Sequence, residues 1–242
     1  MNQQKRMYHE DLDLLRRTRE ATLRLVGGLS DTQFHFTPAR RLRSFELLFF
    51  PLRVLSPPAP RWSIGEVLDH LIRFETVFRK DFATIIALKL SGRDPELRLG
   101  FREIDVSFAF IPRLFLPILE IPVSAFSQAV PNAMVEYLTK NRLLPAQSPD
   151  IAAPRKGRRK LALCQELRDS WTASADLFQA NPDLDYRRMF RQHPTTGRQH
   201  VLEALRMIAL HEQRHQTQIQ EILEEPAFPR SVAEPAVARH RP

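Results

Sequence analysis

Proline is unevenly distributed along this 242-residue chain, and its distribution limits where long helices can form. A proline inside a helix removes a backbone hydrogen bond and clashes with the preceding turn, so a long helix needs a proline-free stretch. The 19 prolines leave four such windows, at 1–37, 61–94, 155–181 and 195–225. We therefore expect one long helix in each window.

The first two windows contain the clearest helix signals. Apolar residues at three- and four-residue spacing predict an amphipathic helix over 7–26, and Gly27 is a typical residue at which to end it. The segment 30–33 (Ser-Asp-Thr-Gln) has the spacing of a capping box, which predicts a short extra turn. Ser63 and Glu66 form a second capping box and predict the start of the second long helix.

The third and fourth windows carry similar apolar stripes. In the third window the stripe covers 161–178 and ends before Pro182, and in the fourth it covers 201–222 and ends before Pro226. Neither these windows nor their connections show a convincing alternating pattern of a strand. The sequence therefore predicts an all-α fold, an up-down four-helix bundle.

The proline-rich segments 38–60 and 95–154 are longer than the connections usual in compact bundles. Apolar stretches within 95–154 predict short helices packed on the bundle. These helices would supplement the core or form the surface of a homodimer, and an interfacial membrane or lid element is the alternative. We expect residues 1–225 to form a single domain with these two inserts, followed by a disordered tail over 226–242.

Charge and cysteine content narrow the class of protein further. The net charge of +8 and the pI of 10.2 allow attraction to nucleic acid or anionic lipid without requiring it. The basic run 155–160 fits a solvated linker best; an anionic thiol or nucleic acid is the alternative ligand, although no recognised nucleic-acid fold accompanies it. The single Cys164 and a start without the apolar region of a signal peptide favour the cytoplasm. We expect a small-molecule substrate and no specific nucleic-acid or membrane partner.

Three of the eight histidines lie where a bundle helix needs apolar side chains. His70 shares the stripe of Val67 and Phe74, and His211 and His215 are one turn apart on the fourth predicted helix. Buried imidazoles are costly unless their ring nitrogens find partners, and one metal ion would satisfy all three. The alternative is a set of hydrogen-bonded histidines in the core or on the surface.

Residues 211–215 (His-Glu-Gln-Arg-His) also match H-E-x-x-H, the metalloprotease motif in which the glutamate is the general base. Those enzymes need a third ligand. The longer metzincin form of the motif requires glycine and histidine where this chain has Gln218 and Glu221. We therefore do not expect a protease. His193 is expected at the mouth of the site or at a turn, and His200 at the surface. Three histidines carry no functional signal: His9, His35 and His240.

Two blocks of the chain resemble the DinB/YfiT-like family. The first is 62–71 (Trp-Ser-Ile-Gly-Glu-Val-Leu-Asp-His-Leu). The second runs from 193–197 (His-Pro-x-x-Gly) through 211–219 (His-x-x-Arg-His-x-x-Gln-Ile). The resemblance implies an up-down four-helix bundle with a three-histidine metal site, and the long inserts depart from compact members. Carried over by position, the ligands are His70, His211 and His215.

Members of this family with known activity look like metal-dependent transferases of small thiols, including bacillithiol- and mycothiol-dependent enzymes. The resemblance therefore implies a divalent ion, with zinc or nickel first and iron or manganese next, and a low-molecular-weight thiol. Three imidazoles leave coordination positions open, as in catalytic sites. Such a site can deprotonate a thiol or a water molecule at neutral pH.

Two glutamates are candidates for the proton transfer that such a reaction needs. Glu212 is the candidate catalytic base, and Glu66 is a second candidate that its capping box explains better. The sequence thus predicts a metal-dependent enzyme, S-transferase-like or hydrolase-like. The alternative is a non-enzymatic binding protein whose basic surface contacts nucleic acid or membrane and whose histidines are structural.

Overall fold

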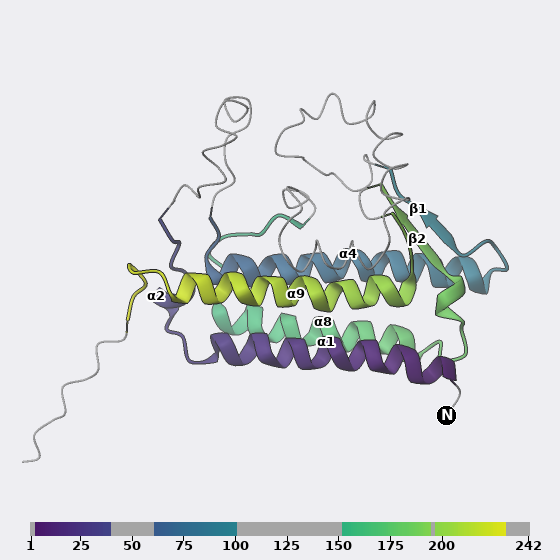
Figure 1. Cartoon of the computed structure of the whole chain (residues 1–242), viewed down its shortest axis with the longest axis horizontal. Helices are drawn as coiled ribbons and strands as arrows, with labels where there is room; N and C mark the ends of the chain where they lie inside the picture. The colour runs from purple at the N-terminus through teal and green to yellow at the C-terminus, as the bar shows by residue number, and fades with distance from the viewer. Residues whose placement is uncertain (1–2, 40–60, 101–151, 195–196, 231–242) are drawn as a thin grey trace, which may run out of the picture.

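The computed structural model describes residues 3–39, 61–100, 152–194 and 197–230. Within these ranges the chain is mostly helical, and four long helices lie side by side (Figure 1). They are α1 (Gln3–Gly27), α4 (Ile64–Leu90), α8 (Lys160–Gln179) and α9 (Val201–Leu223). Each falls in one of the four proline-free windows, so the helical prediction is confirmed.

Local signals explain where the helices begin. Ser63 caps α4 and Glu66 reaches back to its backbone, as the capping box predicts. A second capping box opens the short helix α2 (Asp31–Phe34). Helix α8 begins after Arg159, which provides no side-chain cap. This poor start agrees with the basic run there, because cations oppose the helix dipole at an N-terminus.

The helices do not simply alternate in direction along the chain. Asp11 pairs with Arg206 and Thr22 pairs with Glu212, so α1 and α9 run the same way. The start of α8 packs in the same apolar cluster as the start of α4, and Phe178 meets Phe82 near their ends, so these two helices are also parallel (Figure 1). Helix α8 therefore begins at the same end of the bundle as α4.

A small sheet lies at one end of the four helices, where the sequence showed no strands (Figure 1). Strand β2 (Phe190–His193) pairs with β1 (Glu96–Arg98) in parallel and with β3 (Gly197–His200) in antiparallel fashion. Gly197 has a positive φ of 75°, which glycine adopts without steric cost. The strands are only three or four residues long, too short to show an alternating pattern.

Apolar side chains form two clusters, one toward each end of the helices. The cluster near the sheet includes Leu12, Phe82 and Leu205, and the other includes Val67 and Ile219. Between them along the helices lies a layer of buried polar residues. We call this set the polar layer: Arg19, Thr22, Glu75, Ser174 and Glu212.

Several sequence predictions fall outside the described residues or at their edge. The short helices predicted within 95–154 lie almost wholly outside them. The tail predicted over 226–242 does not begin at 226, because Phe228 is buried against Phe36 and the Pro229 carbonyl accepts a hydrogen bond from Gln33. The burial of Phe228 could not be predicted, because the surrounding sequence is rich in proline and weakly apolar.

The α4 cap gives a stability prediction. Replacing Ser63 by alanine should lower the free energy of unfolding by about 1 kcal/mol, because the Glu66 amide loses its acceptor. Urea denaturation with a chelator present measures the difference. Ser91→Ala, at the exposed other end of α4, is the control and should change stability by less than about 0.5 kcal/mol. Equal losses in the two variants would contradict this account of the cap.

Candidate metal centre

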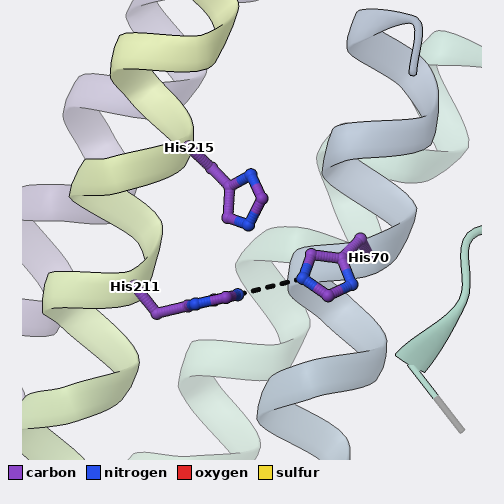
Figure 2. A group of neighbouring side chains, drawn as sticks. All are labelled: His70, His211 and His215. Carbon is purple, nitrogen blue, oxygen red and sulfur yellow. Dashed lines mark hydrogen bonds between the residues drawn. The ribbon is translucent and has the colours of Figure 1, made fainter. Parts of the chain in front are cut away.

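Helices α4 and α9 bring together the three histidines that the sequence singled out. The rings of His70, His211 and His215 point into the space between the two helices (Figure 2). One nitrogen from each ring lies within 4.8 Å of the others. Among the described residues, this group has the ligand types and spacing to hold a metal ion. The structure thus places together all three predicted ligands.

Hydrogen bonds orient two of these rings. The Nδ1 of His70 lies 2.7 Å from the backbone carbonyl of Ala152, and that of His215 lies 2.8 Å from Oε1 of Gln218. Carbonyl oxygens only accept, so each Nδ1 carries the proton and each Nε2 carries the lone pair. A metal-ligating histidine commonly donates its second ring nitrogen to a carbonyl or carboxylate in this manner.

The site holds His70 and His211 in the neutral form that metals require. Burial lowers the pKa of His70 to about 4, although the bond to Ala152 opposes this shift. Burial and then the neighbouring His215 and His70 hold the pKa of His211 well below its usual value. His70 and His211 are therefore ready to donate a lone pair at neutral pH.

Aromatic rings form the walls around the histidines. The Trp62 ring centroid lies 4.8 Å from that of His70, and Phe74 stacks on His211 at 3.9 Å. His70 and His215 are buried, whereas His211 is partly exposed. These ring contacts restrict rotation of the histidines, and His211 is the most exposed of the three.

The donor set fits a divalent metal ion. The Nε2 atoms of His70 and His211 face each other at 2.9 Å, and Nε2 of His70 carries a lone pair (Figure 2). A shared proton or a shared cation satisfies that contact, and only a cation also satisfies the nearby His215. Neutral imidazoles suit zinc, nickel, copper and iron. Three ligands leave coordination positions open, as at catalytic rather than structural zinc sites.

Glu212, the predicted catalytic base, belongs to the polar layer. Its carboxylate accepts hydrogen bonds from Arg19 at 3.0 and 3.1 Å and from Thr22 at 2.6 Å. These partners lie on α1, whereas His211 faces α4. Such a buried ion pair favours a structural role for this carboxylate. Glu66 is bonded to Ser63 and performs the capping role.

The structure does not bring the remaining sequence candidates to the centre. His193 ends strand β2 opposite Gly197, and its burial holds its pKa well below the usual value. His200 was expected at the surface; it is partly buried and caps α9 by accepting from the Glu203 amide. The basic run is not simply a solvated linker, because Arg155 and Arg158 both bind the buried Asp69.

The sequence did not reveal the residues that orient the three histidines. The Ala152 carbonyl lies 82 residues from His70 in the chain, and a backbone acceptor carries no sequence signal. Gln218 belongs to the motif that follows His215, so its position one turn after a ligand was the available clue. Asp69 precedes His70, and the sequence alone suggests an exposed carboxylate, because its partners Arg155 and Arg158 are distant in the chain.

None of the described helices is both long and apolar enough to cross a bilayer. No curated protein and no solved structure matches this chain at a significant level. The family model of the DinB superfamily does match, and its match covers residues 14–219. That range contains α4 and α8 completely, most of α9, the second half of α1 and all three histidines of the centre. The chain therefore belongs to the DinB superfamily.

Proposed function

We propose that this protein is a metal-dependent enzyme that uses one divalent ion at His70, His211 and His215 to activate a small thiol or a water molecule. The observation that carries the proposal is the convergence of three imidazoles, two of them oriented by acceptors at Nδ1. Zinc or nickel is the preferred ion and iron or manganese the alternative. The substrate is a small molecule, and the reaction takes place in the cytoplasm.

The ion supplies Lewis acidity, which lowers the pKa of a thiol or water bound to it. The chain's own residues bind and orient. His70 and His215 present their Nε2 lone pairs, Trp62 and Phe74 restrict rotation of the rings, and His211 is the most exposed of the three. Glu212 does not act as the proton acceptor, because its carboxylate accepts hydrogen bonds from Arg19 and Thr22.

The basic surface does not favour nucleic-acid or membrane binding as the main function. The run 155–160 has five cations, and three of them make contacts within the fold: Arg155 and Arg158 with Asp69, and Lys160 with the carbonyl of Gly27. Cations committed to internal partners contribute less to an external electrostatic surface.

Metal analysis tests the proposed centre. Protein purified without a polyhistidine tag should contain about one divalent ion per chain, because a three-histidine site holds a single ion. His211→Ala should lose this ion, since two imidazoles remain. His9→Ala, which removes an exposed histidine of α1, should keep it. Equal metal content in the His211→Ala and His9→Ala proteins would overturn the assignment.

The reaction class needs a second measurement on the metal-loaded protein. Low-molecular-weight thiols, including bacillithiol and mycothiol, are offered with an alkylating electrophile, and ester hydrolysis is assayed in parallel. Thiol consumption that depends on both the ion and His211 supports the transferase, and ester cleavage with that dependence supports the hydrolase. Binding of the ion without either activity would reduce the proposal to a metal-binding protein.

A further inference from the structure

A buried carboxylate next to a metal-site histidine holds the segment that follows the second insert. Asp69, fully buried on α4, accepts from the Arg155 backbone amide at 2.8 Å and from the Arg155 guanidinium at 3.0 Å. The Arg158 guanidinium donates to the same carboxylate at 2.9 Å. Burial of a carboxylate is costly, and these charge-assisted bonds offset that cost.

The same segment supplies the acceptor that orients His70. The Ala152 carbonyl, three residues before Arg155, lies 2.7 Å from Nδ1 of His70, and Ala152 is itself buried. Asp69 and His70 are adjacent on α4, and they bind the two ends of the stretch 152–155: His70 bonds to Ala152 and Asp69 bonds to Arg155. Loss of the contact between Asp69 and Arg155 must therefore disturb the contact between His70 and Ala152.

The segment is also tied to helix α8. Arg158 binds Glu166 as well as Asp69, which fixes the chain between α4 and α8. Two carboxylates and the guanidinia of Arg155 and Arg158 make a neutral group. Loss of any one member leaves an unbalanced charge, and in the case of Asp69 that charge change is buried.

We propose that Asp69, Arg155 and Arg158 are positioning residues that hold the Ala152 carbonyl against His70 and thereby set the orientation and tautomer of this ligand. The inference rests on the proposed metal centre. Partners that accept from the non-ligating nitrogen of a histidine typically change metal affinity 10–100-fold when they are lost. The basic run thus acts inside the protein, through a backbone carbonyl, on the metal centre.

The test measures the affinity for zinc by competition with a chromophoric chelator. Asp69→Asn and Arg158→Met should weaken zinc binding about 10–100-fold. Arg155→Met should weaken it less, because the Arg155 amide still binds Asp69. Arg159→Met is the matched control, since Arg159 is an exposed cation of the same run, and it should bind zinc like the unmodified protein. The visible spectrum of the cobalt-loaded protein should change in the first three variants and not in the fourth.

A second readout separates this inference from the proposed function. In the metal-free protein, nitrogen NMR of the His70 ring should show the proton on Nδ1, and Asp69→Asn should shift the ring toward the other tautomer. If the unmodified protein binds no zinc, the proposed function fails while this tautomer shift still tests the positioning role. Should Asp69→Asn not fold, Arg155→Met, which removes a half-exposed side chain, provides the same comparison. Unchanged zinc affinity and an unchanged tautomer in folded variants would overturn the inference.

Discussion

Replacing Arg19 by methionine is expected to lower the free energy of unfolding by about 3–5 kcal/mol. The Arg19 side chain is almost fully buried in the polar layer and binds Glu212 at 2.9 Å and Glu75 at 2.7 Å. It also donates to the Leu167 carbonyl, so one side chain joins all four long helices. Burial disfavours the guanidinium charge, but Glu212 and Glu75 more than offset this and raise the pKa of Arg19. Methionine leaves two buried carboxylates without their shared cation.

Urea denaturation of the metal-free protein measures this loss. Arg16→Met is the control on the same helix, because Arg16 pairs with Asp13 and Glu20 in solvent, where such pairs contribute about 0–1 kcal/mol. Adding Glu75→Gln and Glu212→Gln to the Arg19→Met protein should restore much of the lost free energy of unfolding, because the two buried charges are then removed. A loss in Arg19→Met no larger than in Arg16→Met would show that the polar layer is not held by this cation.

The long helices and the grouping of the three histidines could be predicted because both depend on local spacing. Proline excludes helix interiors wherever it occurs, and His70, His211 and His215 interrupt apolar stripes whose period is visible in the sequence. The direction of α8 could not be predicted in this way. It depends on which end of α4 the start of α8 packs against, and no local spacing determines that choice.

The polar layer and the sheet were not predictable because their residues resemble exposed ones. Arg19, Glu75 and Glu212 read as surface charges until their partners on other helices are known. Arg191 of β2 is likewise buried, where it pairs with Asp81 and lies over the Phe78 ring. Charged residues are rarely buried without a partner of opposite charge. Here those partners lie far along the chain, and a single sequence does not show which residues pair.

A divalent ion should stabilise the protein strongly, and this stabilisation should depend on His70. A ligand that binds only the folded state stabilises it by about 4 kcal/mol at a thousand times its dissociation constant. For a chain of this size that corresponds to a rise in Tm of about 8–16 °C. Thermal unfolding is recorded at fixed pH with a chelator and then with zinc, and the rise should be nearly absent in His70→Ala.

The comparison within each variant makes this prediction specific to the metal. Removing the buried His70 ring changes stability through lost packing, and that effect is the same with chelator and with zinc, so it cancels in the difference. Zinc that binds the unfolded chain lowers the rise in every variant alike. His9→Ala keeps all three ligands and should respond like the unmodified protein. A zinc-dependent rise in His70→Ala equal to that of His9→Ala would place the ion elsewhere.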